Sequence, residues 1–260
     1  MKISQAELKY LRSLQQKKYR DRERKFILEG WRVLGDALES DFQIEKILFT
    51  QRKDLGPENS TLIYMAQKKN IPVKELTEYQ LNQISDAVHS QGVIALVHKK
   101  EYNIESFNYE STSLIVACDR ISDPGNLGTI LRTCDWFGVT TIFLNEDCVS
   151  LYNEKVLRAT SGSIFHLNIY EHLRYDSVLP FLKTKDFKII ATSPDAQSLA
   201  TFKKPKKSII IMGNEADGIC KELLRLADNV ISIPRFGKAE SLNVGIATGI
   251  ILTQFRLSHE

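Results

Sequence analysis

The sequence predicts an α/β fold in which a small α/β domain precedes a larger domain built on a parallel sheet. Short apolar runs alternate with segments of helical periodicity through most of the 260 residues. In the second half these runs are continuous stretches rich in Ile and Val, as is typical of strands buried on both faces of a parallel sheet. The polar stretch at residues 100–112 separates the two series, and we interpret it as a linker.

The first 24 residues predict a basic helix with Leu8, Leu11 and Leu14 on one apolar stripe. Residues 1–25 hold nine Lys or Arg and three acidic residues, although the net charge of the chain is only +3. A basic arm of this kind can contact phosphate groups. A solvated helix face explains the same charges equally well.

The small domain is expected at residues 25–99, with an element in each apolar or periodic stretch. Strands are predicted at 26–30, 44–49 and 92–97, and helices at 31–40, 60–70 and 77–87. The larger domain is expected at residues 113–260. Its strands are predicted at 114–118, 141–144, 188–192, 208–212 and 230–233, and its helices at 126–137, 153–161, 175–183, 218–226 and 241–256.

The composition limits the class of protein. Hydrophobic residues make up 43% of the chain, which is enough for a packed core. The N-terminus does not resemble a signal peptide, and the apolar stretch VGIATGIIL is too short to span a bilayer. We therefore expect a soluble, cytoplasmic protein without a membrane partner. The four cysteines and five histidines have no metal-ligand spacing, so we expect reduced thiols and no metal site.

A turn rich in Gly, Pro and Asn, SDPGNLGTILR at residues 122–132, follows the first strand of the larger domain. Ligands gather beyond the carboxyl ends of parallel strands, so this turn occupies a functional position. It contains neither the G-x-G-x-x-G fingerprint nor a Gly-Lys-Ser/Thr sequence, which argues against the two common nucleotide loops. Either the helix N-terminus binds a phosphate, or Arg132 is an ordinary surface residue of a capped helix.

Two later stretches place further polar residues at strand ends. In IIIMGNEADGI (209–219), Gly213 ends a strand and would let a ligand approach the backbone, and Glu215 follows it. In ISIPRFGKAESLNV (231–244), Ser241 and Asn243 stand at the expected entry of the last helix, where they can cap the helix or contact a ligand.

Together the three stretches resemble the signature motifs of the SpoU (TrmH) family of RNA 2′-O-methyltransferases, which belongs to the SPOUT class. The matching motifs are N-x-G-x-x-x-R at 126–132, G-N-E-x-x-G at 213–218, and I-P with S-L-N-V at 233–244. The resemblance covers about residues 113–256. Residues 1–99 are similar to the family's L30e-like substrate-binding extension. The resemblance implies a trefoil-knotted SPOUT domain, a homodimer formed through it, and S-adenosylmethionine as the methyl donor.

The resemblance also implies roles for individual residues. Gly213, Ile233 and Leu242 match the donor-binding positions, and Thr192 is a further wall of that site. Arg132 matches the catalytic residue, and it either takes the proton of the ribose 2′-hydroxyl or stabilises the developing alkoxide. Asn126, Glu215, Ser241 and Asn243 match the supporting polar residues. We expect Glu215 to hold the Arg132 guanidinium by paired hydrogen bonds.

The chain departs from the family at two positions, Arg235 in place of a frequent Met and Gly245 in place of a usual Ser. We expect Arg235 to contact an RNA phosphate and Arg22 to contact RNA. Arg158 either contacts RNA from the partner subunit or is an ordinary exposed residue of a helix. The resemblance favours ribosomal RNA over tRNA as the partner and gives no reason to expect DNA. A tRNA methyltransferase and a non-catalytic RNA-binding protein on the same scaffold remain the alternatives.

Overall fold

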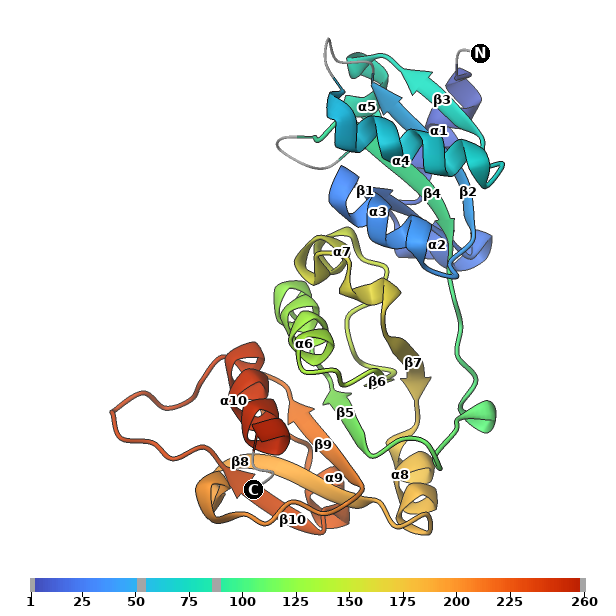
Figure 1. Ribbon diagram of the computed structural model, residues 1–260. Coiled ribbons are helices and arrows are strands. Elements are labelled where there is room, and N and C mark those ends of the chain that lie inside the picture. The colour runs from blue at the N-terminus through green and yellow to red at the C-terminus, as the bar shows by residue number, and fades with distance from the viewer. Residues whose placement is uncertain (1–2, 51–54, 86–89, 258–260) are drawn as a thin grey trace. The chain divides into compact units, whose positions relative to one another are not determined.

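The computed structural model describes residues 3–50, 55–85 and 90–257, and its contacts group the chain into two units. The first unit consists of Met1–Lys100 and Tyr152–Phe165, and the second of Glu101–Leu151 and His166–Glu260. Figure 1 shows the elements of both units in chain order from blue to red. No helix within the described residues is long and apolar enough to cross a bilayer.

The first unit contains a mixed sheet of four strands in the order β1-β4-β2-β3. Strands β2 and β3 are parallel, and β4 is antiparallel to both β1 and β2. The elements up to residue 98 are α1 (Gln5–Ser13), α2 (Lys17–Glu23), β1 (Lys25–Glu29), α3 (Trp31–Glu39), β2 (Ile44–Thr50), α4 (Gly56–Lys68), β3 (Val73–Leu76), α5 (Glu78–Ile84) and β4 (Val93–His98). The predicted strands and helices of the small domain are therefore present, with shifted ends.

The prediction of a single basic helix over residues 1–24 is wrong. The segment forms two helices, and α2 ends at Arg24 in the left-handed conformation with φ 53°. The stripe of Leu8, Leu11 and Leu14 is buried, as predicted. Arg20 is also buried, and its guanidinium donates to two backbone carbonyls of the connection between the helices. The buried Arg20 therefore holds the connection between the two helices, which helical periodicity alone does not reveal.

Two other helix ends differ from the prediction. Helix α4 begins at Gly56 rather than residue 60, because Pro57 fits the first turn of a helix, where its missing N–H costs nothing. Helix α5 ends at Ile84, and residues 86–87 of the predicted helix lie outside the described residues.

The segment Tyr152–Phe165, which contains α7 (Glu154–Thr160) and η2 (Ser163–Phe165), belongs to the first unit by its contacts. The Tyr152 ring lies 4.6 Å from that of Phe26, and the Phe165 ring lies 4.9 Å from that of Phe42. The sequence prediction placed this segment in the larger domain, because that domain was expected to begin at residue 113. The aromatic contacts with residues more than a hundred positions earlier group the segment with the first unit instead.

The second unit is built on a six-stranded sheet in the order β10-β8-β9-β5-β6-β7, in which every neighbouring pair is parallel. This confirms the predicted parallel sheet. Its elements are η1 (Ile104–Ser106), β5 (Leu114–Asp119), α6 (Pro124–Trp136), β6 (Thr141–Asn145), β7 (Asn168–Leu173), α8 (Tyr175–Lys183), β8 (Lys188–Ser198), η3 (Leu199–Thr201), β9 (Ser208–Gly213), α9 (Lys221–Leu226), β10 (Asn229–Ser232) and α10 (Val244–Leu257). Strand β7, at the edge of the sheet, was not predicted.

Both faces of this sheet are covered. On one face Ile115 and Ile211 pack in a core cluster with residues of α8 and α9. Alternate residues such as Val116 and Ile210 point to the other face and are also fully buried, on the side where α10 contacts β9. Phe107 is buried in the first of these cores, so residues 100–112 are more than the simple linker that was predicted.

Strand β8 is longer than predicted and changes register against β10. Ile190 and Ala191 pair with Asn229 and Val230, whereas the next pairs are formed by Gln197 and Ser198. Residues 192–196 therefore leave the β8–β10 ladder at the carboxyl edge of the sheet.

Candidate active site

The adjacent strands β5 and β9 end together at the carboxyl edge of the parallel sheet. Asp119, the last residue of β5, pairs with Gly213, the last residue of β9. Two loops therefore leave the sheet side by side. One leads from β5 into α6, and the other is formed by residues 214–220, which we call the donor loop. Ligands bind at such an edge in open parallel sheets.

A cavity of about 710 Å³ lies at this edge, large enough for a cofactor-sized molecule. Its walls come from the segment after Ala191, the donor loop, and the segment between β10 and α10. All four predicted donor-binding residues line it: Thr192, Gly213, Ile233 and Leu242. Glu215, Ser241 and Arg235 line it as well.

Gly213 is required by close backbone packing. A Cβ atom at this position would lie 2.5 Å from both the Gly218 carbonyl carbon and the Ile219 nitrogen. The donor loop folds back on itself here, since Asn214 and Gly218 exchange backbone hydrogen bonds of 3.1 and 2.9 Å. Residues 213–219 of this tight fold line the cavity.

Three of the predicted polar residues form a continuous line beside the cavity. The Asn243 side-chain amide donates to Asn126 Oδ1 at 2.7 Å, and the Asn126 amide donates to Glu215 Oε1 at 2.6 Å. Asn243 also caps α10, because its Oδ1 accepts from the Gly245 N–H at 2.9 Å. We call Asn243, Asn126 and Glu215 the polar line. Each amide donates on one side and accepts on the other, so the orientation of the Glu215 carboxylate is set from α10 through α6.

Arg132 does not join this line, so the expected pairing of Glu215 with Arg132 is wrong. Glu215 instead accepts from Asn126, and the exposed Arg132 makes no hydrogen bond or ion pair with any other described residue. Six positions separate Arg132 from Asn126, which places them on different faces of a helix with 3.6 residues per turn. The face of α6 that carries Thr129 packs against α10 at Gly245.

The three predicted RNA-binding residues belong to different units of the chain. Arg235 is exposed in the segment before α10, where its guanidinium lies 3.5 Å from the Ala239 carbonyl oxygen. Arg158 and Arg22 belong to the first unit. Arg158 pairs with Glu154 one turn earlier at 3.7 Å. The exposed Arg22 contacts Glu23 and stacks over the Tyr19 ring at 4.9 Å.

The cysteines are unsuited to nucleophilic chemistry. Burial raises the pKa of the Cys118 thiol well above its usual value and raises that of Cys148 to about 12. Burial likewise raises the pKa of Cys134 and Cys220. The thiolate is the reactive form, so these groups stay protonated and inert at neutral pH. Within the part of the chain that the structure describes, no cluster of His, Cys, Asp or Glu could hold a metal ion.

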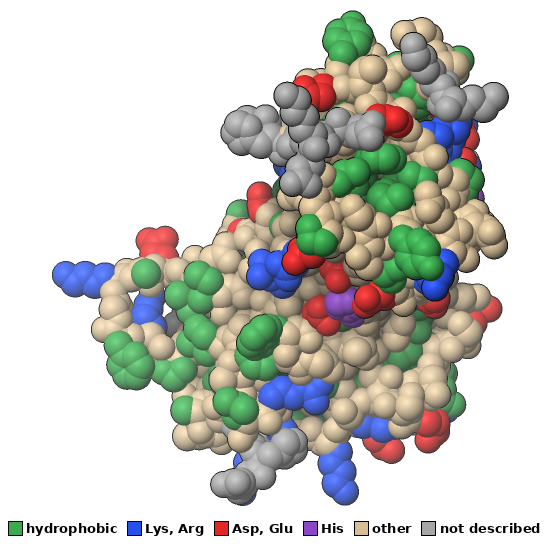
Figure 2. Space-filling view, turned by 45° about the horizontal axis from the view of Figure 1, so that its top comes forward, with side chains coloured by type: hydrophobic (Ala, Val, Ile, Leu, Met, Phe, Trp, Pro, Cys, Tyr) green, Lys and Arg blue, Asp and Glu red, His purple; other side chains and the backbone are tan. Residues whose placement is uncertain are grey.

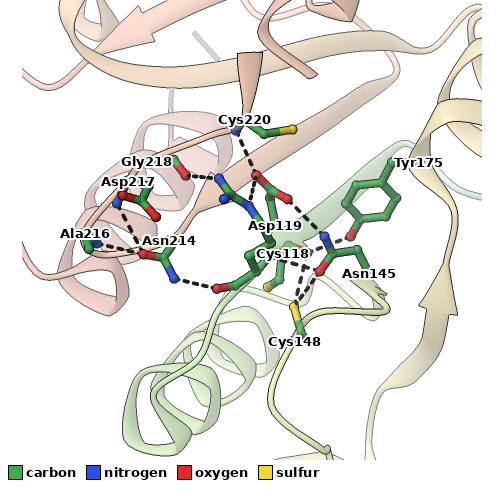
Figure 3. A network of polar contacts seen from close by, with 11 residues as sticks. Cys118, Asp119, Asn145, Cys148, Tyr175, Asn214, Ala216, Asp217, Gly218 and Cys220 are labelled. Carbon is green, nitrogen blue, oxygen red and sulfur yellow. Dashed lines mark hydrogen bonds and ion pairs between the residues drawn. The ribbon is translucent and has the colours of Figure 1, made fainter. Parts of the chain in front are cut away.

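Sequence reasoning missed two residues at this edge, Asp119 and Arg120. Figure 3 shows Asp119 at the end of β5, surrounded by groups from the neighbouring strand ends and the donor loop. The available signal was the charged pair Asp119–Arg120 directly after the apolar run LIVAC. Its partners lie about 25 and 100 residues further along the chain, where no local pattern connects them to it.

Comparison with known families agrees with this geometry. The family model described as SpoU rRNA Methylase family matches residues 113–253, and the MRM3-like substrate binding domain matches residues 5–95. An uncharacterized tRNA/rRNA methyltransferase of Synechocystis is 31% identical over 96% of this chain and 90% of its own. The 23S rRNA (guanosine(2553)-2′-O)-methyltransferase RlmP of Bacillus subtilis is 28% identical over 94% of both chains.

Solved structures resemble the whole chain. An AdoMet-bound rRNA methyltransferase from Sinorhizobium meliloti has a TM-score of 0.86 at 29% identity, covering 100% of this chain and 98% of its own. A putative RNA methyltransferase of the TrmH family from Porphyromonas gingivalis has a TM-score of 0.85 at 27% identity, covering 98% and 99%.

Proposed function

Since the chain belongs to the SpoU rRNA methylase family and is an S-adenosylmethionine-dependent RNA 2′-O-methyltransferase, we propose that its substrate is ribosomal RNA. The observation that carries the methyl-transfer reaction is the polar line beside a cavity that all four predicted donor-binding residues line. The substrate-binding domain matched at residues 5–95 and the 23S rRNA specificity in the name of the Bacillus relative support ribosomal RNA over tRNA.

The cavity fits the methyl donor by its chemistry as well as its size. Apolar side chains such as Ile233 and Leu242 can cover the adenine, and the closely packed backbone at Gly213 offers amide and carbonyl groups to its polar edge. Bound there, S-adenosylmethionine supplies an electrophilic methyl group on its sulfonium. Thr192 closes the wall, where its hydroxyl donates to the Ile211 carbonyl at 3.2 Å.

We assign the acceptor side of the reaction to Arg132 and the polar line. A free guanidinium stays protonated at neutral pH, so Arg132 orients the ribose 2′-hydroxyl and stabilises the alkoxide that develops on it. Asn126 and Glu215 hold the ribose through their remaining hydrogen-bonding capacity, and Ser241 offers a hydroxyl at the cavity wall. Transfer then depends on keeping the hydroxyl, methyl carbon and sulfur in line, and the hydroxyl proton passes to solvent as the O–C bond forms and the C–S bond breaks.

We also propose a homodimer formed through the second unit, as the family resemblance implies. Helices α6 and α10 leave Trp136 86%, Ile246 56% and Leu257 75% exposed. Figure 2 shows hydrophobic side chains gathered on the part of the surface that corresponds to α10 and the segment before it. An apolar surface of this kind is typical of a subunit interface. The trefoil knot and a cytoplasmic location are part of the same proposal. So is the division into domains at 25–99 and 113–260, apart from the segment Tyr152–Phe165, which groups with the first unit.

Methyl transfer from labelled S-adenosylmethionine to unmodified ribosomal RNA and to tRNA, followed by nuclease mapping, tests the proposal. We expect label in ribosomal RNA, at one ribose, as a nuclease-resistant 2′-O-methyl linkage. Label in tRNA alone would favour the alternative substrate. RNA binding without any transfer would favour a non-catalytic role.

A further inference from the structure

The end of β5 is tied to the donor loop by two consecutive residues, Asp119 and Arg120. Asp119 Oδ2 accepts from the Cys220 N–H at 3.0 Å. The Arg120 guanidinium donates to the Gly218 carbonyl at 3.2 Å, and the Arg120 carbonyl accepts from the Asn214 side-chain amide at 2.7 Å. Figure 3 shows Asn214, Gly218 and Cys220 arranged around Asp119. Both ends of the donor loop are therefore attached to β5.

The Asp119 carboxylate is only 1% exposed, and a buried carboxylate is costly unless its oxygens are hydrogen-bonded. It has three donors. Asn145 Nδ2 donates to Oδ1 at 3.0 Å, while the Cys220 N–H and the Arg120 Nε, at 3.0 and 3.4 Å, reach Oδ2. Each oxygen thus has a fixed partner, so the carboxylate holds the start of α9 and the Asn145 side chain in one arrangement.

Arg120 adopts a backbone conformation that is unfavourable for its residue type. Its φ is 56°, in the left-handed region that Gly and Asn adopt more readily. Asn145 Oδ1 accepts the Arg120 N–H at 3.0 Å and so supports this conformation. A turn alone would need only Gly at this position. The Arg side chain adds the contact with the donor loop.

The attached loop faces both halves of the proposed reaction. Residues 214–219 of the loop line the 710 Å³ cavity proposed to hold the methyl donor, which we call the donor cavity. Glu215 within the loop accepts from Asn126 at the start of α6. We propose that Asp119 and Arg120 are positioning residues that hold the donor loop so that the methyl donor and the polar line keep one spacing. This inference rests on the proposed function, because the spacing matters for in-line transfer to a ribose.

The variant Arg120→Gly tests the proposal, because Gly keeps the left-handed backbone without strain and removes only the side chain. We expect the variant to fold with an unfolding midpoint close to that of the wild type, because the relief of backbone strain offsets part of the lost side-chain hydrogen bonds. Either the Kd for S-adenosylmethionine, measured by calorimetry, should rise about tenfold or kcat should fall about tenfold, as expected for the loss of one charged hydrogen bond. The KM for RNA should stay unchanged. Arg174→Ala is the matched control, since it removes an exposed Arg and its 2.8 Å pair with Asp176 elsewhere in the second unit.

Hydrogen exchange gives a readout that does not need catalysis. In Arg120→Gly the amides of the donor loop should exchange faster than in Arg174→Ala. In a second variant, Asp119→Asn, an NH2 group that cannot accept a hydrogen bond replaces one carboxylate oxygen. The three donors that reach both oxygens of Asp119 in the wild type would have only one acceptor oxygen, so the loop should loosen further. If Asp119→Asn does not fold, Arg120→Gly decides alone. If the wild type methylates no RNA, the proposed function fails, while donor affinity and loop exchange still test the positioning role.

The proposal is overturned if Arg120→Gly matches the Arg174→Ala control in donor affinity, kcat and loop exchange. It is equally overturned if the only change is a higher KM for RNA, because Arg120 would then bind RNA directly rather than position the loop.

Discussion

Arg132 lies on α6 with an exposed side chain, and no other described residue holds its guanidinium by a hydrogen bond or ion pair. The spacing from Asn126 in the sequence pointed to this residue as the catalytic candidate. The sequence did not predict its surroundings, because Glu215, the expected partner of Arg132, accepts a hydrogen bond from Asn126 instead. An unheld guanidinium is free to meet the substrate directly.

Arg132→Ala should lower kcat by about 10²–10³-fold, the usual effect of removing one group that stabilises a developing oxyanion. Binding of S-adenosylmethionine should be unchanged, because Arg132 does not line the donor cavity. Single-turnover methyl transfer and calorimetric donor binding measure the two effects. Full activity in the variant would refute the catalytic assignment.

Arg235 lines the donor cavity and is exposed. If it contacts an RNA phosphate, Arg235→Met should weaken RNA binding and reduce the slope of log Kd against log salt concentration by about 1. Filter binding over a salt series measures both quantities. Unchanged affinity and slope would rule out the phosphate contact.

The packing of α10 against α6 explains one departure from the family pattern. A Cβ at Gly245 would lie 2.6 Å from Thr129 Cγ2, whereas a Cβ at Gly249 would lie 3.7 Å from Thr133 Cγ2, which is ordinary contact. The sequence indicated small residues on a buried helix, but which Gly is sterically required depends on the residue that α6 places opposite it.

Gly245→Ala should therefore destabilise the protein by about 1–3 kcal/mol through overpacking. Gly249→Ala is the matched control, and it should be neutral or stabilising by up to about 1 kcal/mol, because Ala favours the helix. Urea unfolding of the two variants measures the difference. Equal stabilities would contradict the close approach of α6 and α10.

Glu7 joins α1 to the sheet of the first unit through Lys46 at 2.8 Å and Lys74 at 3.4 Å. The Lys46 hydrogen bond lowers the pKa of Glu7 in the folded state below its unfolded value. Its stabilising effect is thus fully present above the unfolded pKa and is lost as the pH falls through the folded pKa.

Glu7→Gln should lower the free energy of unfolding by about 0.5–1 kcal/mol at neutral pH, as for a partly exposed ion pair. The difference from wild type should shrink as the pH falls below the ordinary glutamate pKa and through the lower pKa of folded Glu7, because the wild-type side chain then becomes neutral as well. Denaturant titrations at neutral and at acidic pH check this. A difference that does not depend on pH would point to a packing effect instead.

Across the whole molecule, the two units hold different parts of the proposed function. The donor cavity and the polar line belong to the second unit, whereas the basic helices α1 and α2 belong to the first. Deleting residues 1–99 would remove the partners of Tyr152 and Phe165, so charge reversal separates the two functions more cleanly.

Replacing Lys17, Lys18 and Arg22 by Glu should weaken RNA binding. The slope of log Kd against log salt concentration should fall by about one for each RNA phosphate that these side chains bind in the wild type. Donor affinity should not change. The matched control reverses the exposed Lys203 and Lys206 on the second unit. An equal reduction of RNA affinity in both variants would argue against a specific RNA surface on α2.

The fold class and most strands and helices could be predicted from the sequence alone, because periodicity depends on near neighbours along the chain. The resemblance to the family motifs supplied the residues that line the cavity or form the polar line, but not Asp119 and Arg120. The break between α1 and α2, the burial of Phe107, and the grouping of residues 152–165 with the first unit emerged only from the three-dimensional structure. The same is true of the hydrogen bond between Asn126 and Glu215, 89 residues apart, and of the attachment of the donor loop to Asp119 and Arg120, about 100 residues away. These contacts depend on which strand ends lie side by side in the sheet, and the spacing of residues along the chain carries no record of that.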